Sequence, residues 1–449
     1  MNGQLTVLMG EASALDLIAF ALKCSEADQT QVVISRHNSE LTRFSKSRIH
    51  QNVAELNAEV EIKAIIGKKI GYACTNAVDK DSIRDTVRRA VEFAKHQEEN
   101  PDFVSLPVGE KVGCPVQTYY KGTAEFGPED RADAVRNIVQ VSERHGAEAS
   151  GAISIGFMEI AVGNSLGVNQ YNSWTMADTR VTANADTGYG YADFASADIT
   201  KFDFEKIADE AAERAARSKN PEAIEPGEYD VVLQPYAAEE FLSTLAWLGL
   251  GALAVQESRS FMCGKFGEKI CGENVTIWDN GLDPRTSVFP FDPEGVPKQK
   301  VMFIENGIAQ AVCYDSYTAH REGKKSTGHS SGGTGTWGPY PMNMILAPGD
   351  ATVAEMIAST ERGLLVTRFH YTNVLHPILT TFTGMTRDGT FLIENGKVTK
   401  PIMNLRFTEN VLDALSNVEM IGKDLKLQVT CAVPALKVKS FRFTGGTEF

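Results

Sequence analysis

The sequence lacks the pair of histidines that a zinc hydrolase site built on one helix requires. Such a site places two histidines one helical turn apart, with a glutamate between them as general base. The chain has eight histidines, and no two of them are separated by three or four residues. This spacing excludes a one-helix zinc site. A metal site could then arise only through the tertiary fold, and its candidate ligands are His320, His329, His370 and His376.

Cysteine and long apolar runs are also scarce. The seven cysteines form an odd, scattered set without a CxxC pair, which argues against a disulfide framework or a zinc finger. The longest uncharged apolar stretch, Phe241–Val255, is shorter than the ~20 residues that span a bilayer. The N-terminus lacks the positive region of a signal peptide, and Glu11 and Asp16 interrupt its apolar run. We expect a cytoplasmic protein that has no membrane partner.

Basic residues are fewer than acidic residues in this chain. The 58 acidic residues outnumber the 44 lysines and arginines, so the net charge is −14. A negative field of this kind repels a polyanion unless a local basic patch outweighs it. The basic runs Lys68-Lys69, Arg88-Arg89 and Lys324-Lys325 are short and have acidic neighbours. We therefore expect no nucleic-acid partner.

Local patterns predict a mixed N-terminal domain over residues 1–220. Apolar periodicity and capping residues indicate four helices: Ala12–Lys23, one capped by Asp79, one from Pro128 to near Gly146, and one capped by Asp203. Alternating or β-rich runs predict strands at Thr30–Arg36, Glu40–Ser45, Glu59–Ile66 and through Ala152–Ala192, with turns at Gly163–Ser165 and Gly188–Gly190.

A linker rich in proline and polar residues, Ser218–Gly227, precedes a β-rich C-terminal domain over residues 226–449. A strand at Tyr229–Gln234 and a helix at Tyr236–Leu248 open this domain. Its remaining predicted elements are Asn-Gly hairpins at Phe303–Gly307 and Leu392–Gly396, a helix capped by Thr352 and Glu355 that ends at Gly363, and a strand at Leu364–Val366. The fold class is α+β, with a C-terminal domain built mainly on antiparallel sheet.

The pattern G-x-S-x-G occurs at Ser165 and at Ser330. A nucleophile elbow needs this pattern between a strand and a helix, which exposes the serine above an oxyanion hole. Neither occurrence is followed by a helical pattern, so we do not favour a serine hydrolase.

The loop Gly328–Gly338 is the most unusual local feature of the chain. It has no Lys-Ser/Thr ending, so it gives little support to a phosphate-binding loop. Its free backbone N–H groups and its single aromatic side chain suit the wall or lid of a cleft that binds an extended peptide, although a plain surface loop fits equally well. The candidate substrate-binding residues are Gly328, His329, Gly332, Gly333, Trp337 and, outside the loop, Arg362.

Several stretches, taken together, resemble the TldD/PmbA family of peptide-processing proteins, also known under the label modulator of DNA gyrase. They follow the family's order along almost the whole chain. The stretches are Ile49–Asn52, Ile65–Asn76, Gly163–Gly167, Arg259–Phe261, Lys265–Lys269, Tyr314–Ala319, Ser326–Gly328, Gly363–Thr367 and Leu392–Lys397.

The resemblance implies one of two branches. TldD-like members carry an HExxxH zinc motif on the helix after the first strand of the C-terminal domain, together with a late cysteine ligand. PmbA-like members, also called TldE, lack the motif. Here the corresponding helix, Tyr236–Leu245, contains Glu239 and Glu240 but no histidine. Cys431 falls near the position of the late ligand, but one thiol does not hold a catalytic zinc, so we interpret it as a core cysteine.

The leading hypothesis is therefore a PmbA/TldE-like, non-catalytic subunit of a metallopeptidase complex that processes small or unfolded peptides. We expect no catalytic residue, metal ligand or cofactor in this chain, because the zinc belongs to a TldD-like partner. Two alternatives remain: a stand-alone peptidase with a relocated metal site, and a homodimeric peptide-binding protein.

Overall fold

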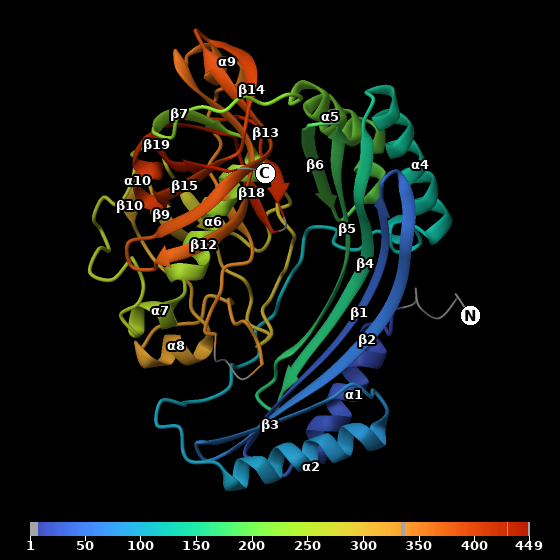
Figure 1. Cartoon of the computed structure of the whole chain (residues 1–449). Helices are drawn as coiled ribbons and strands as arrows, with labels where there is room; N and C mark the ends of the chain where they lie inside the picture. The colour runs from blue at the N-terminus through green and yellow to red at the C-terminus, as the bar shows by residue number, and fades with distance from the viewer. Residues whose placement is uncertain (1–7, 334–336, 429, 448–449) are drawn as a thin grey trace.

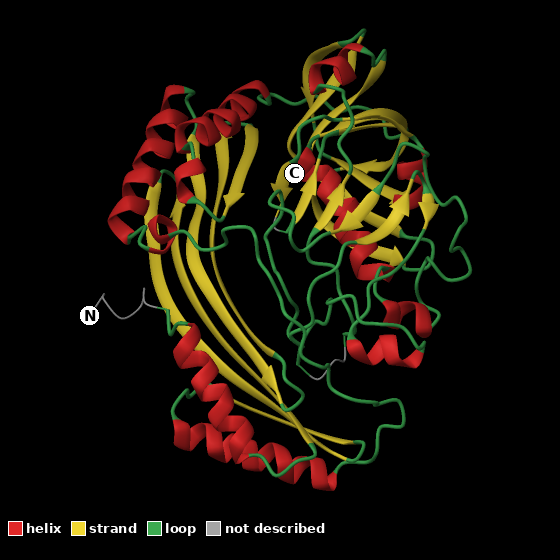
Figure 2. Ribbon diagram, turned by 180° about the vertical axis from the view of Figure 1, so that it is seen from behind, coloured by secondary structure: helices red, strands yellow, loops and turns green. Residues whose placement is uncertain are grey.

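The computed structural model describes residues 8–333, 337–428 and 430–447. The N-terminal half contains one antiparallel sheet with the strand order β3-β2-β1-β4-β5-β6. Its strands are β1 Gln29–Ser45, β2 Arg48–Ile66, β3 Lys69–Thr75, β4 Glu148–Asn164, β5 Asn169–Ala185 and β6 Gly188–Ser196. The long central strands curve around the C-terminal half (Figures 1 and 2).

Helices cover the outer face of this sheet at both ends (Figure 2). Alternation along β4 shows why: Ile153 and Ile155 pack under helices, whereas Met158 and Ile160 point to the opposite face, toward the C-terminal half. The helices of the N-terminal half are α1 Glu11–Cys24, α2 Lys80–His96, α3 Lys121–Ala124, α4 Pro128–Arg144, η1 Ile199–Lys201 and α5 Phe204–Arg217. The predicted caps Asp79 and Asp203 are confirmed, because each side chain accepts backbone N–H groups.

Two predictions about this sheet were wrong. The segments Thr30–Arg36 and Glu40–Ser45 belong to one strand, because β2 and β4 pair with β1 along almost its full length. Gly188–Gly190 is not a turn but the start of β6, and the chain reverses at Asp186 and Thr187. In both places the polar or glycine-rich sequence concealed a strand that its neighbours hold by backbone pairing.

The C-terminal half contains two sheets. In one, β12, β7, β19, β15 and β13 pair in turn, and β13 pairs back to β12, so these five strands close into a ring. The other sheet has the order β10-β9-β8-β11-β18-β17. The strands are β7 Glu228–Leu233, β8 Ile277–Asp279, β9 Val301–Glu305, β10 Ile308–Ala309, β11 Met344–Leu346, β12 Arg362–His376, β13 Thr381–Glu394, β14 Lys397–Ile402, β15 Leu405–Asn410, β16 Val418–Ile421, β17 Lys426–Gln428, β18 Cys431–Val433 and β19 Leu436–Gly446.

Phenylalanines fill the core of this half. The rings of Phe369 and Phe407 lie 4.4 Å apart, and Phe382 links them to Phe241 of helix α6. The helices here are α6 Pro235–Gly249, α7 Ala252–Gln256, α8 Ser316–Arg321, α9 Val353–Ala358 and α10 Val411–Ser416. The predicted α+β class with a mainly antiparallel C-terminal part is confirmed. Among the described residues, no helix is long and apolar enough to cross a bilayer.

Local signals in the C-terminal half were mostly correct. Both Asn-Gly pairs form hairpin turns with positive φ, at Asn306 and at Asn395. The capping box of Thr352 and Glu355 is present, but its helix ends at Ala358 and not at Gly363. The segment that contains His370 and His376 is part of β12, and register shifts interrupt its pairing with β13.

A buried ion pair fixes α4 to the sheet. Arg131 of α4 is 1% exposed, and its guanidinium lies 2.6 Å from the Glu40 carboxylate and 2.9 Å from the Thr42 hydroxyl of β1. Removing one partner of a buried pair leaves the other charge unpaired, which costs more free energy than losing an exposed pair. This contact places the charge of Glu40 beside an opposite charge inside the fold.

We predict that Arg131→Met lowers the free energy of unfolding by about 3 kcal/mol. The matched control on the same helix is Arg136→Met, which removes an exposed pair with Asp133 and should cost less than about 1 kcal/mol. Urea unfolding followed by circular dichroism measures both. Equal losses for the two variants would contradict the structural role assigned to Arg131.

Candidate functional site

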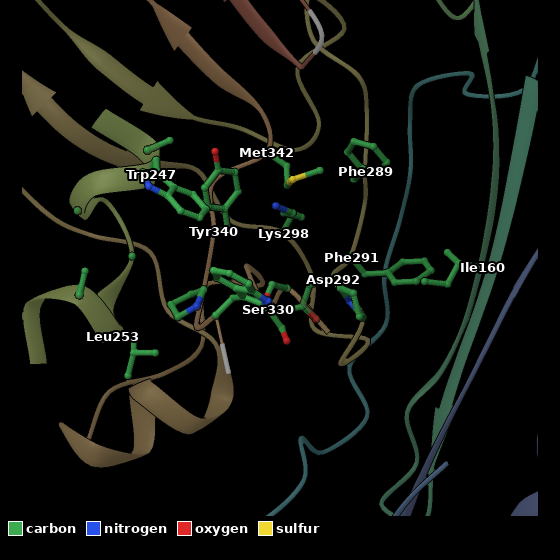
Figure 3. Close-up of a pocket in the computed structure, with 18 of the residues that line it drawn as sticks. Ile160, Trp247, Leu253, Phe289, Phe291, Asp292, Lys298, Ser330, Tyr340 and Met342 are labelled. Carbon is green, nitrogen blue, oxygen red and sulfur yellow. Dashed lines mark hydrogen bonds between the residues drawn. The ribbon is translucent and has the colours of Figure 1, made fainter. Parts of the chain in front are cut away.

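A cavity of about 860 Å³ lies between the inner face of the N-terminal sheet and the C-terminal half; we call it the central cavity. One wall is formed by alternate residues of β4 and β5 that share a face, namely Met158, Ile160, Asn172 and Trp174. Figure 3 shows Ile160 beside the ring of Phe291, and the two side chains belong to one apolar cluster. The Trp174 ring meets Phe289 edge to face, with centroids 5.0 Å apart. Aromatic contacts thus join the two halves of the chain at the cavity.

The other wall comes from α6, α7 and loops of the C-terminal half. Ser330, Ser331 and Trp337, which belong to the predicted glycine-rich loop, line the cavity. Trp337 is 74% exposed, and its ring lies 5.7 Å from that of Trp247 at the end of α6. The loop therefore forms part of a cavity wall, as one of the two interpretations expected. Residues 334–336 of the loop lie outside the described residues.

Several glycines of this loop are required by its backbone conformation or by close contacts. Gly328 has a φ of 72°, and a Cβ there would lie 2.4 Å from the Pro297 carbonyl oxygen, so only glycine fits. Gly332 and Gly333 also have positive φ, and Gly332 approaches Pro293, another cavity-lining residue.

His329 lies in the core beneath the loop and has no exposed surface. Its Nε2 is 3.0 Å from Asp279 Oδ1, and its Nδ1 is 2.9 Å from the Thr327 hydroxyl. Burial and the charge of Lys298 lower the pKa of His329, so the ring is neutral. The Nε2–H donates to the ionised Asp279, whereas Nδ1 lies beside two oxygens of Thr327, the hydroxyl and the carbonyl at 2.8 Å.

Asp279 connects both ends of the loop. Its Oδ2 accepts the backbone N–H of Asn343 at 2.6 Å, while Oδ1 accepts from His329. Burial alone raises the pKa of Asp279, but the hydrogen bond from His329 and the charge of Lys298 outweigh it and lower the pKa. The carboxylate is therefore ionised, and it anchors the chain before and after the segment that lines the cavity.

Arg362 is not part of this cavity. It begins β12 on the exposed surface, where its guanidinium lies 5.9 Å from the centroid of the Tyr229 ring beside Asp230. Of the six candidate substrate-binding residues, Trp337 lines the central cavity, and Arg362 lies elsewhere. Gly328, His329, Gly332 and Gly333 belong to the same loop but are not part of the cavity lining. The substrate-binding role of the predicted residues remains a prediction.

A second, polar cavity of about 210 Å³ lies beside α6, between β6 and β12. Glu239 and Glu240 of α6 line it together with Asp193 and Arg368. Burial raises the pKa of Glu239 to about 7, although the Ser243 hydroxyl donates a hydrogen bond to it. Burial also raises the pKa of Glu240, which accepts a hydrogen bond of 2.9 Å from Thr372.

Cys431, in β18, is buried near this cavity. Burial, with a further contribution from Glu239, raises the pKa of its thiol to about 12, so the sulfur is protonated at neutral pH. A thiol in this state is a core side chain rather than an anionic ligand.

The four histidines considered as relocated metal ligands do not converge. His320 lies on α8, His329 is held by Asp279, and His370 and His376 lie on β12. Across residues 8–333, 337–428 and 430–447, no three histidine, cysteine or acidic side chains form a group that could hold a metal ion.

The two G-x-S-x-G segments have structural roles. Ser165 lies in the turn between β4 and β5, where its hydroxyl accepts the N–H of Thr30 at 3.1 Å. The Ser330 N–H donates to Asp292 at 2.8 Å. Neither serine lies between a strand and a helix, which is the setting of a nucleophile elbow.

Protein-family models match most of the chain. Models described as PmbA/TldA metallopeptidase domain 1, central domain and C-terminal domain match residues 31–94, 123–219 and 226–445. The chain belongs to the PmbA/TldD family.

Relatives within the PmbA/TldD family are distant. An uncharacterized protein of Methanocaldococcus jannaschii is 28% identical over 293 residues, which cover 64% of this chain and 67% of that protein. A metalloprotease of Methanothermobacter thermautotrophicus is 26% identical over 235 residues, so the match spans about half of each chain. The crystal structure of TldE from Thermococcus kodakarensis has a TM-score of 0.88 at 21% identity, over 96% of this chain and 99% of that one. This last likeness shows a shared fold.

The raised pKa of Glu239 leads to a prediction about pH. A carboxyl group that binds its proton more tightly in the folded state makes the protein less stable as pH rises from about 4.5 to about 7. Glu239→Gln, which cannot ionise, should therefore raise the free energy of unfolding by about 2 kcal/mol at pH 8 and change it little at pH 4.5. Urea unfolding at the two pH values measures the difference.

The control for this prediction is Glu268→Gln, because Glu268 is exposed and lies away from α6. Its effect on stability should be small and independent of pH. A Glu239→Gln variant that is no more stable than the parent at pH 8 would disprove the burial argument.

Proposed function

We propose that this chain is a PmbA/TldE-like subunit that carries no peptidase chemistry of its own and pairs with a TldD-like zinc peptidase. In this assembly the chain would help to enclose small or unfolded peptides, and the partner would cleave them. The family membership supports a role in metallopeptidase chemistry, and the residues of α6 support the choice of branch.

Helix α6 is the observation that carries the proposal. It follows β7, the first strand of the C-terminal half, which is where the resemblance places the HExxxH helix of TldD-like members. The side chains that α6 directs into the polar cavity are Tyr236, Glu239 and Glu240. Tyr236 is already engaged, because its hydroxyl donates to Glu210 at 2.8 Å and accepts from Lys426 at 2.6 Å.

These residues do not fit a catalytic zinc. Such a site uses three protein ligands and keeps a fourth position open for water. Around α6 the candidate donors are the thiol of Cys431 and the acidic side chains of the polar cavity, Asp178, Asp193, Glu239 and Glu240. Burial raises the pKa of Glu239 and of Glu240 and keeps the Cys431 thiol protonated. Among the described residues, no three such side chains form a group that could hold a metal ion. We therefore derive no catalytic step through a metal in this chain.

The central cavity supports the peptide part of the proposal. It is large, mainly apolar, and lies between the inner face of the sheet and the C-terminal half. Ligand sites commonly lie between two parts of a fold and combine apolar walls with few polar groups. An extended peptide with apolar side chains suits such a space.

Co-expression with the TldD-like protein of the same genome tests the proposal. We expect the two chains to co-purify as a complex that hydrolyses unfolded peptides, whereas this chain alone shows no hydrolysis. The matched control is a complex whose partner carries glutamine in place of the glutamate of HExxxH, since loss of that general base should abolish the activity.

Three results would argue against pairing. Peptidase activity of this chain alone would favour the stand-alone enzyme. A stable homodimer that binds peptides and ignores the TldD-like protein would favour the homodimeric binding protein. Full activity of the TldD-like protein without this chain would remove the need for a second subunit.

A further inference from the structure

Two hydrogen-bond donors in the central cavity have no partner among the described residues. The side-chain nitrogen of Asn172 is buried and forms no hydrogen bond, and the ammonium group of Lys298 forms no ion pair or hydrogen bond within the same ranges. They come from different walls, because Lys298 belongs to a loop of the C-terminal half and Asn172 to β5 of the sheet. Neither belongs to α6 or to the polar cavity discussed above.

Lys298 is only 9% exposed, yet it forms no hydrogen bond or ion pair with any residue in the described ranges. Figure 3 places it in the cavity beside Met342, Tyr340 and Ser330. A buried charge without a partner is costly, so such groups are normally paired. The nearest candidates within the chain are two carboxylates, Asp279 and Asp292.

Both carboxylates are already engaged. Asp279 is held by His329 and by the Asn343 N–H. Asp292 accepts three backbone N–H groups, from Ser330 at 2.8 Å and from Glu294 and Val296 at 3.0 Å each. The charge of Lys298 helps to lower the pKa of Asp279, whereas burial and Glu294 raise the pKa of Asp292 to about 8, so Asp292 carries little charge at neutral pH. Among the described residues, neither group forms an ion pair with Lys298. The ammonium group is thus free to meet a ligand.

Asn172 provides the second donor. Its side-chain nitrogen is buried and unpaired. The residue pairs with Ile160 in the sheet and shares its face with Trp174, so this face is directed toward the C-terminal half. Among the described cavity-lining residues, no buried side-chain oxygen is left without a hydrogen bond. The unsatisfied groups of the cavity are therefore donors only, and they select a ligand that supplies acceptors.

The rest of the lining is apolar and rich in aromatic rings. These side chains are Trp174, Trp247, Phe289, Phe291, Tyr340 and Met342. Flat rings and a thioether suit an aromatic or branched apolar body, which buries its surface by stacking.

We propose that the central cavity binds the carboxylate of an apolar, aromatic molecule, with Lys298 and Asn172 as the groups that contact the carboxylate. The chemistry is shared by the C-terminal carboxylate of a peptide and by a small aromatic acid. The assignment rests on the proposed role of the central cavity in peptide binding, and it adds which end of the ligand the chain contacts and through which groups. Binding is measured on this chain alone, so its failure is distinguishable from a failure to pair with a TldD-like protein.

Titration calorimetry on the purified full-length chain tests the site with three probes. They are N-acetyl-phenylalanyl-phenylalanine with a free carboxylate, its C-terminal amide, and 3-phenylpropanoate. We expect at least one carboxylate probe to bind, and the amide to bind at least about tenfold more weakly than the free dipeptide. Binding of the dipeptide alone assigns a peptide C-terminus, binding of phenylpropanoate alone assigns a small acid, and binding of both assigns a general carboxylate site.

Lys298→Met should weaken carboxylate binding at least about tenfold, because it removes the charge that contacts the carboxylate. The unfolding midpoint of the variant is measured alongside, since the charge of Lys298 also lowers the pKa of Asp279. Lys298→Arg should retain binding, since it keeps the charge. The control is Lys300→Met, whose side chain lies over Trp278 and outside the cavity. The proposal fails if no carboxylate probe binds, if the amide and the acid bind equally, or if Lys298→Met binds as tightly as the parent.

Discussion

One buried carboxylate holds the site together. Asp279 lies at the end of β8 and has no exposed surface, and it fixes His329 on one oxygen and the Asn343 N–H on the other. The chain between these two contacts supplies Ser330, Trp337, Tyr340 and Met342 to the cavity wall. A loop with so many glycines would otherwise have high conformational entropy. The contacts of Asp279 with His329 and with the Asn343 N–H restrain this loop, which forms part of the cavity wall.

Burial and hydrogen bonding also determine the state of the residues that could have been metal ligands. A neutral His329 uses both ring nitrogens in hydrogen bonds, Cys431 is held as a thiol by burial, and Glu239 is pushed toward its protonated form. Each is a metal-ligand type, and each is committed to the folded structure. In this chain, a member of a family named for metallopeptidases, these side chains contact other parts of the folded structure.

Local signals in the sequence predicted much of the fold, because capping residues, Asn-Gly turns and apolar periodicity act over a few residues. The caps Asp79 and Asp203 and the turn at Asn395 illustrate this. The predictions failed where distant residues determine the structure. β1 is continuous because β2 and β4 pair with it through residues 37–39, and β4 lies more than a hundred residues further along the chain. In the candidate site, too, local features were predicted from the sequence and features that depend on distant residues were not. The loop at Gly328 was visible as a glycine-rich run. No local pattern marks Lys298 or Asn172, because only the folded structure shows that these two donors lack partners among the described residues.

In the proposed assembly the zinc chemistry belongs to the TldD-like partner. Zinc content tests this assignment most directly, measured in each subunit after a reconstituted complex is separated under non-chelating conditions. We expect one zinc per partner subunit and a substoichiometric trace in this chain. One tightly held zinc per copy of this chain would contradict it.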